Sequence, residues 1–175
     1  MTIVMLSHML TDTQHFTLST PMGVVSDTHG LLRDEALRVL DGCDLILHLG
    51  DVGNMDILTQ LADMAPLVAV RGNIDRDDWC DVLPKVRNIV VNDWRLHLVH
   101  DIADLDKTVV CDAVLFGHSH KPCQEWITGE DMPPRLYFNP GSAGKRRFRL
   151  PITAGRLWVD SRGIRSSIEH LVLTI

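Results

Sequence analysis

The sequence lacks several features that would assign it to a class at once. It has no apolar stretch of the roughly 18 to 20 residues that a membrane span requires, and its start, MTIVMLSHML, has neither the basic flank nor the cleavage site of a signal peptide. The cysteines are few and widely spaced, with no CxxC motif, which excludes a secreted disulfide scaffold. We therefore expect a soluble, cytoplasmic protein with reduced thiols at Cys43, Cys80, Cys111 and Cys123.

An excess of positive charge is also missing. The chain has 17 Lys and Arg against 23 Asp and Glu, a formal net charge of −6. Such a chain is not attracted over long range to nucleic acid or to an anionic membrane. It also has no basic stripe with interleaved aromatic residues, the pattern of polynucleotide-binding proteins. We predict no extended nucleic acid and no membrane as partners, so any phosphate group must be bound locally.

Two hydrophobic periods alternate in the first half of the chain. Short apolar runs over residues 22–26, 44–50 and 66–72 predict strands, and residues 31–40 and 54–64 have the apolar spacing of helices. Asn54 is a suitable N-cap for the second helix. Alternating strands and helices predict a parallel sheet with right-handed crossovers.

The second half predicts antiparallel pairs instead. Residues 85–100 have the pattern of a hairpin turned at Asn92–Asp93, residues 122–128 and 135–139 form another pair, and residues 152–173 form a hairpin turned at residues 161–163. The expected fold is α/β (α+β-like), a mixed β-sandwich flanked by helices. We expect one domain over residues 22–175, and an N-terminal extension of uncertain role over residues 1–21 that is dispensable for metal binding.

Polar side chains follow the predicted strands where each strand ends. In open α/β sheets, the loops at the carboxyl ends of the strands converge into ligand sites, so these side chains should cluster. Their oxygen and imidazole nitrogen donors suit manganese, iron or zinc, and their number suits two metals that share one carboxylate. These residues are Asp27, His29, Asp51, Asn73, His100, His118 and His120.

Any one of these residues alone has a plainer interpretation. Asp51 or Asn73 beside a glycine is more often a turn residue or helix cap than a ligand, and His118 and His120 alone would fit a solvated loop. Only their joint occurrence favours a metal site. His48 and His97 lie inside predicted strands and are interpreted as core or sheet-face residues.

The segments SDTHG, LGDVGN, GNID, LVH, GHSHKP and FNPGS occur in this order between Met22 and Ser142. They resemble the motifs of the calcineurin-like metallophosphoesterases, and specifically the small one-domain branch of phosphodiesterases that is related to Vps29. The resemblance implies a four-layer α-β-β-α fold and a dinuclear site. It places Asp27, His29 and His120 on one metal, Asn73, His100 and His118 on the other, and Asp51 between them.

The resemblance also implies an activity. A hydroxide held between two divalent ions, manganese by first expectation and nickel, zinc or iron as alternatives, would attack phosphorus in line. Asp51, Asn73 and His100 would lie at the reaction centre, and the substrate would be a small phosphodiester or nucleotide-like molecule. The alternative is a non-catalytic interaction scaffold on the same fold, and a nuclease is chemically allowed. A homo-oligomer is also compatible with the sequence.

The chain departs from the pattern of the family at two places. Ile74 follows Asn73 where the wider superfamily has a histidine that protonates the leaving group, so we expect diesters and activated esters to be cleaved more readily than alkyl monoesters. Relatives usually have a glycine after the histidine that corresponds to His100, and often another histidine beyond it, whereas this chain has Asp101 and Ile102. Asp101 either disturbs the pocket and the second metal or orients an imidazole as a hydrogen-bond acceptor.

A basic run follows the last motif. Lys145, Arg146 and Arg147 either contact a substrate phosphate or form a solvated basic loop. The second interpretation is favoured because charged residues cluster readily on protein surfaces.

Overall fold

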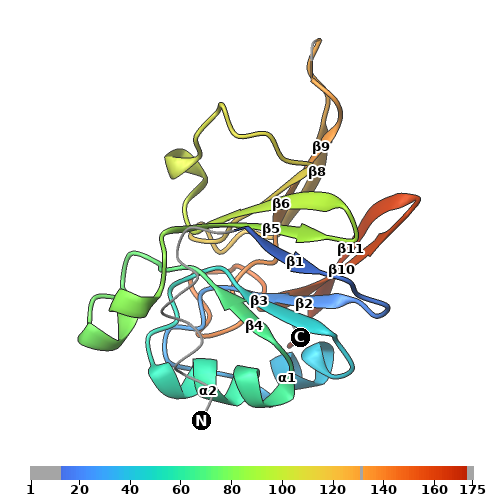
Figure 1. Cartoon of the computed structure of the whole chain (residues 1–175). Coiled ribbons are helices and arrows are strands. Elements are labelled where there is room, and N and C mark those ends of the chain that lie inside the picture. The colour runs from blue at the N-terminus through green and yellow to red at the C-terminus, as the bar shows by residue number, and fades with distance from the viewer. Residues whose placement is uncertain (1–12, 131, 173–175) are drawn as a thin grey trace.

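The computed structural model describes residues 13–130 and 132–172, and it shows two β-sheets packed face to face (Figure 1). One sheet contains the parallel strands that the first half of the sequence predicts, with an antiparallel hairpin added at one side. Its strands, in spatial order, are β11 (Gly163–His170), β10 (Thr153–Asp160), β2 (Met22–Val25), β3 (Leu45–His48) and β4 (Leu67–Ala69).

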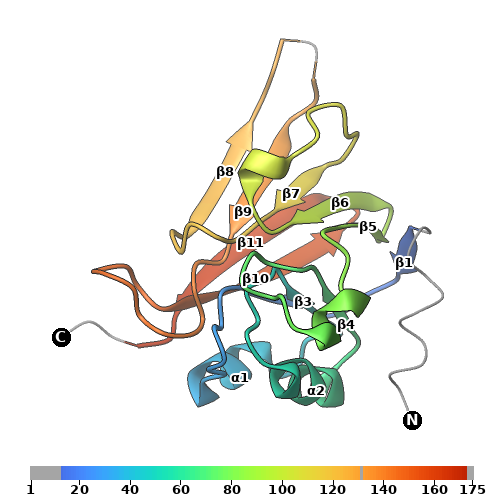
Figure 2. The ribbon, with the colours of Figure 1, turned by 90° about the vertical axis from the view of Figure 1, so that its left-hand side faces the viewer.

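The second sheet is mixed and has six strands. β6 pairs in parallel with β7, and β7 with β9, whereas β5–β6 and β8–β9 are antiparallel hairpins. The β8–β9 hairpin extends beyond the rest of the molecule (Figure 2). The strands, in spatial order, are β1 (Gln14–Phe16), β5 (Val86–Val91), β6 (Trp94–Val99), β7 (Ala113–Leu115), β9 (Arg135–Asn139) and β8 (Cys123–Ile127).

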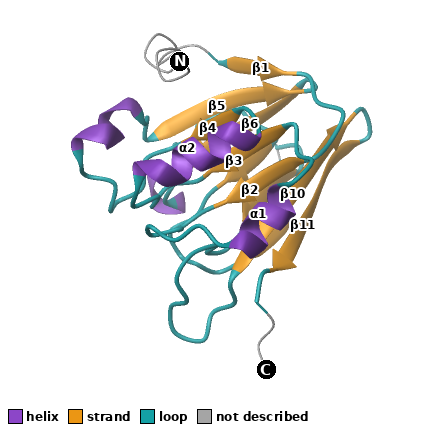
Figure 3. Ribbon diagram, turned by 90° about the horizontal axis from the view of Figure 1, so that it is seen from below, coloured by secondary structure: helices purple, strands orange, loops and turns teal. Residues whose placement is uncertain are grey.

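Both α-helices cover the outer face of the five-stranded sheet (Figure 3). They are α1 (Asp34–Leu40) and α2 (Met55–Met64), and their apolar sides pack against that sheet through Leu40 and Leu61. The Asn54 side chain accepts a hydrogen bond of 2.9 Å from the Asp56 amide, which confirms the predicted N-cap. No helix among the described residues is long and apolar enough to cross a membrane.

The outer face of the six-stranded sheet has a different cover. Leu105 and Val109 pack there on Val114 and Phe116, and the segment that carries them contains only the short 3-10 helix η3 (Ile102–Asp104). The mixed sandwich flanked by helices is thus confirmed, and its fourth layer is a loop with a single helical turn. The other 3-10 helix, η2 (Asp78–Val82), follows β4.

The predicted hairpin turns are present. Asn92 and Asp93 both have positive φ, 46° and 72°, as a type I′ turn requires. The C-terminal hairpin pairs Asp160 with Gly163, so its loop is Ser161–Arg162.

The structure also describes part of the predicted extension. The extension contributes β1, an edge strand parallel to β5, and residues 1–12 lie outside the described part of the chain. The boundary at residue 22 stays a prediction.

Candidate metal centre

The seven predicted ligands come together at one rim of the sandwich. The loops after β2, β3 and β4 approach it from the five-stranded sheet, and those after β6 and β7 approach it from the six-stranded sheet. Backbone hydrogen bonds join the first two loops, from the Asp27 amide to Gly50 O and from the His29 amide to Asp51 O, each 3.0 Å long. The site is therefore built between the two sheets.

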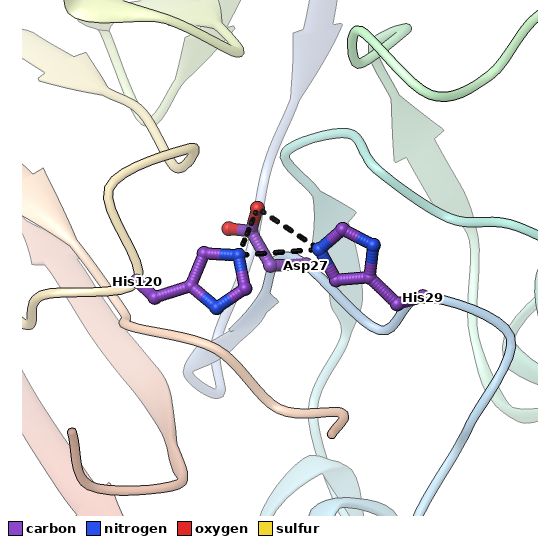
Figure 4. Close-up of side chains that lie close together, drawn as sticks. All are labelled: Asp27, His29 and His120. Atoms are coloured by element: carbon purple, nitrogen blue, oxygen red, sulfur yellow. Dashed lines mark hydrogen bonds and ion pairs between the residues drawn. The ribbon is translucent and has the colours of Figure 1, made fainter. Parts of the chain in front are cut away.

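Asp27, His29 and His120 form the first cluster (Figure 4). His120 Nε2 lies 3.3 Å from Asp27 Oδ1 and 3.1 Å from His29 Nε2, and His29 Nε2 lies 3.9 Å from the same carboxylate oxygen. All three side chains are almost completely buried. Three ligand atoms thus surround one point.

Asn73, His100 and His118 form the second cluster with Asp51. Asn73 Oδ1 lies 3.2 Å from His100 Nε2 and 3.0 Å from His118 Nδ1. Asp51 Oδ1 lies 3.3 Å from His100 Nε2. This cluster is more open than the first, because Asn73 and His118 are exposed.

Asp51 connects the two clusters. Its Oδ2 atom lies 3.7 Å from His29 Nε2, while Oδ1 faces His100 and accepts a 3.0 Å hydrogen bond from the Ile74 amide. One oxygen faces each cluster, which is the geometry that a bridging carboxylate needs.

Backbone strain is concentrated at the ligands. Asp27, His29, Asp51, His118 and His120 all have φ between 47° and 64°, a region that costs free energy for residues other than glycine. Asn92, Asp93 and Phe148 are the other non-glycine residues with positive φ in the described part of the chain. Strain at five of the seven ligands indicates that the loops are shaped for the site.

Asp51 and His100 favour each other's charged forms. Burial raises the pKa of Asp51, but hydrogen bonds from His100 and Ile74 and the nearby imidazoles outweigh it and lower the pKa to about 2. Burial lowers the pKa of His100, and the stronger opposing effect of Asp51 raises it. His100 Nδ1 donates to Leu49 O over 2.7 Å, so Nε2 faces Asp51 and Asn73.

The first cluster fits a metal ion by its own contacts. Asp27 Oδ1 is buried and has no hydrogen-bond partner, although buried polar atoms normally have one. His29 Nε2 and His120 Nε2 lie 3.1 Å apart, and bonds from imidazole nitrogen to a metal such as zinc are about 2.0 to 2.1 Å long, so one ion can contact both nitrogens. A cation between them satisfies the orphaned oxygen and both nitrogens.

Polar residues behind the ligands hold the loops in place. His48 accepts from the Gly50 amide at Nδ1 and contacts Thr28 Oγ1 at Nε2, over 3.2 and 2.9 Å. Asp75 accepts from the amides of Val52, Gly53 and Gly72. Our sequence interpretation placed His48 in the core and gave Asp75 no role; the signal for His48 is a polar residue within an apolar run, and the sequence around Asp75 holds no such signal.

Two further residues fix the third side of the rim. Asn139 Nδ2 donates to Gly117 O over 2.8 Å, and Ser142 Oγ donates to Asp27 O over 2.9 Å. The FNPGS segment thus supports the ligand loops. His97 is buried within its strand and lies 2.8 Å from Asn88 Oδ1, away from the ligands.

The basic run lies on the surface. Lys145, Arg146 and Arg147 are exposed, and the loop begins at Gly144, whose carbonyl accepts a 2.9 Å hydrogen bond from Arg33. Burial lowers the pKa of His29, and the Arg147 charge adds to this shift. Arg147 therefore acts electrostatically on the first cluster, and neither earlier interpretation of the run is decided.

The fold and the two clusters define a class of protein, a two-sheet sandwich with two candidate metal-binding groups of oxygen and nitrogen atoms at its rim. The sequence pattern of the calcineurin-like phosphoesterase superfamily domain matches residues 21–162. The chain belongs to this family.

Two relatives in the sequence comparison are probable metallophosphoesterases. The chain is 33% identical over 139 residues to a probable metallophosphoesterase from Methanocaldococcus jannaschii, covering 69% of this chain and 67% of the relative. It is 32% identical over 147 residues to another from Methanothermobacter thermautotrophicus, covering 74% and 81%.

Solved structures share the fold. A Thermotoga maritima protein superposes with a TM-score of 0.65 at 24% identity, covering 87% of this chain and 99% of that one. Vps29 from Entamoeba histolytica in complex with zinc also gives 0.65, at 15% identity and 87% and 100% coverage. The phosphoesterase Yfce from E. coli gives 0.58, at 23% identity and 81% and 89% coverage.

Proposed function

We propose that the protein is a hydrolase that uses two divalent metal ions to cleave phosphodiester or activated phosphoester bonds. The convergence of all seven ligand side chains into two groups that share Asp51 carries this proposal. Manganese is our first expectation for the metal, with nickel, zinc and iron as alternatives, because the mixed oxygen and imidazole donors suit all of them. We further propose that the protein acts in the cytoplasm.

The proposal assigns the seven ligand residues to two metal ions. Asp27, His29 and His120 hold one ion, and Asn73, His100 and His118 hold the other, with Asp51 between them. The ions, when bound, supply a nucleophilic water at neutral pH and offset the charge that develops on the phosphoryl oxygens. The buried first cluster excludes bulk solvent on one side, so the substrate reaches the site from the side of Asn73 and His118, which are exposed.

In the part of the chain that the structure describes, the position next to Asn73 holds no side chain that can protonate a leaving group. Ile74 occupies that position; its side chain is partly exposed and its amide is held by Asp51. General acid catalysis contributes roughly two to four powers of ten. Diesters and esters with good leaving groups are therefore the proposed substrates, in preference to alkyl monoesters, and a small nucleotide-like diester suits the site better than a polynucleotide because the chain is acidic.

Arg147 is the strongest candidate for an additional substrate contact. It is exposed and close enough to shift the pKa of His29, and arginine binds phosphate oxygens in a bidentate fashion. Replacing Arg147 with alanine should raise KM for an anionic diester and leave kcat nearly unchanged. An unchanged KM would show that the loop that carries Arg147 is solvated and does not contact the substrate.

The alternative is a non-catalytic interaction scaffold, with a second copy of the chain as one candidate partner. Trp126 and Ile127 are about half exposed on the edge strand β8, which favours a protein contact there. Metal binding does not separate the two functions, because a Vps29 structure is itself a zinc complex. Catalysis does.

The decisive experiment is a hydrolysis panel. Metal-free protein is reloaded separately with manganese, nickel, zinc and iron and assayed on phosphomonoesters, diesters and cyclic nucleotides. We expect diesterase activity with at least one metal and a loss of at least about 100-fold in Asp51→Asn, since removal of the shared charge disrupts both clusters. The control Asp63→Asn removes an exposed carboxylate from α2. No activity with any metal would favour the scaffold.

A further inference from the structure

Asp101 lies beside the second cluster and is held from two directions. Its Oδ1 atom accepts a 2.9 Å hydrogen bond from the Ala103 amide, which caps η3. Its Oδ2 atom lies 3.5 Å from His118 Nε2. Because the cap fixes one oxygen, the other is presented to the imidazole without further ordering of the side chain.

His118 differs from the other imidazole ligands in its surroundings. Its side chain is 45% exposed, whereas that of His100 is 6% exposed. His100 is oriented by the backbone carbonyl of Leu49. For His118, the group that faces the outer nitrogen in the described part of the chain is the Asp101 carboxylate.

The two ring nitrogens of His118 face different partners. Nδ1 lies 3.0 Å from Asn73 Oδ1, inside the second cluster, and Nε2 faces Asp101. Both partners can only accept a hydrogen bond, so without a metal Asn73 Oδ1 favours a proton on Nδ1, whereas the charged Asp101 carboxylate favours the tautomer in which Nε2 carries the proton. The lone pair is then on Nδ1, where a metal can be bound.

We propose that Asp101 is a positioning residue that holds His118 in the orientation and tautomer needed to bind the second metal. This inference rests on the dinuclear site of the proposed function. A metal-bound histidine commonly donates its other N–H to a carboxylate, and loss of such a partner typically costs 10- to 100-fold in metal affinity. The acidic residue after His100 thereby secures an exposed ligand that the fold does not bury.

Asp101→Asn tests this with little change elsewhere. The asparagine oxygen can still cap η3, but its amide would face His118 as a donor and favour the opposite tautomer. Asp104→Asn is the matched control, because it removes an exposed carboxylate from the same 3-10 helix. Two measurements are made: calorimetric titration of the metal-free protein with Mn²⁺ alone, and nitrogen NMR of the imidazole rings without metal.

We expect Asp101→Asn to weaken the second Mn²⁺ by about 10- to 100-fold and leave the first unchanged, with the Asp104→Asn protein resembling wild type. The NMR spectrum of His118 should move from protonation at Nε2 towards protonation at Nδ1. Equal second-site affinity in both variants, equal weakening of both sites, or a wild-type protein that binds one ion would overturn the proposal. Two-ion binding that depends on Asp101 without hydrolysis would uphold it and refute the proposed function.

Discussion

The Nε2 atoms of His29 and His120 face each other at 3.1 Å, beside a buried Asp27 oxygen that has no hydrogen-bond partner. At most one proton fits between two imidazole nitrogens at this distance, and two protons would repel. The arrangement is thus poorly satisfied by protons and well satisfied by a cation.

This relationship predicts a large effect of metal on stability. A ligand at 100 times its Kd stabilises the folded state by about 2.7 kcal/mol, which corresponds to a rise in Tm of roughly 5 to 10 °C for a chain of this size. Thermal unfolding of metal-free protein with added Mn²⁺ measures it. His120→Ala should lose most of the shift and His170→Ala, at an exposed strand end, should keep it. Equal shifts in the two variants would contradict the assignment of the first cluster.

The position of the site could be predicted from the sequence because each ligand lies within the five residues that follow a strand. Asp27 comes two residues after β2, and His100 directly follows β6. Strand periodicity and turn residues are local signals, so they can be recognised in the sequence without knowledge of the fold. The joint occurrence of the motifs then indicated one site.

The support of the site could not be predicted in the same way. The Asp75 carboxylate accepts hydrogen bonds from three backbone amides in two loops. The strained φ angles of the ligands depend on how these loops pack. These features arise from tertiary contacts that leave no local pattern. The thin fourth layer is a different case, because Ile102, Leu105 and Val109 have helical spacing although the segment forms only the short η3.

His48 predicts a fall in stability at mildly acidic pH. Burial lowers its pKa from 6.5 to about 4 in the folded protein. Below pH 6.5 the unfolded chain takes up a proton that the folded chain does not, so the free energy of unfolding decreases as the pH falls from 6.5 to 4, by about 3 kcal/mol in total. Above this window His48 has no effect on the pH dependence.

Urea unfolding at pH 7.0 and 4.5 in a metal chelator measures this contribution. Other groups also titrate in this range, so the quantity of interest is the difference between wild type and His48→Gln. The variant should lose about 2.4 kcal/mol less between the two pH values, because pH 4.5 lies above the pKa of His48 in the folded protein. His15→Gln, at an exposed position, should retain the wild-type decrease; an equal decrease in His48→Gln would show that this imidazole does not titrate as expected.

Gly72 predicts that the loop after β4 tolerates no side chain. A Cβ atom there would collide with the backbone nitrogen and the carboxylate of Asp51. We expect Gly72→Ala to lower stability by about 1 to 3 kcal/mol and to weaken metal binding at both clusters, because Asp51 must move. Gly129→Ala is the control, since its Cβ would lie 3.5 Å from the side chain of Met132. Chemical unfolding and metal titration of the two variants provide the comparison, and a Gly72→Ala protein with normal metal affinity would argue against this tight approach.

Ile74 offers a way to test the missing general acid by adding one. It follows Asn73 at the open rim, its side chain is 39% exposed, and its amide is anchored to Asp51, so a histidine at this position needs no burial. An optimised general acid increases the reaction rate by about two to four powers of ten. We expect Ile74→His to raise kcat for alkyl phosphoesters by about 10-fold. The kcat for nitrophenyl esters should change little, because their leaving groups need no proton. The pH profile for alkyl esters should gain a decreasing limb near the imidazole pKa of about 6.5. Ile74→Gln controls for polarity, and a similar gain in that variant, or an equal gain on both kinds of ester, would show that protonation of the leaving group does not limit this enzyme.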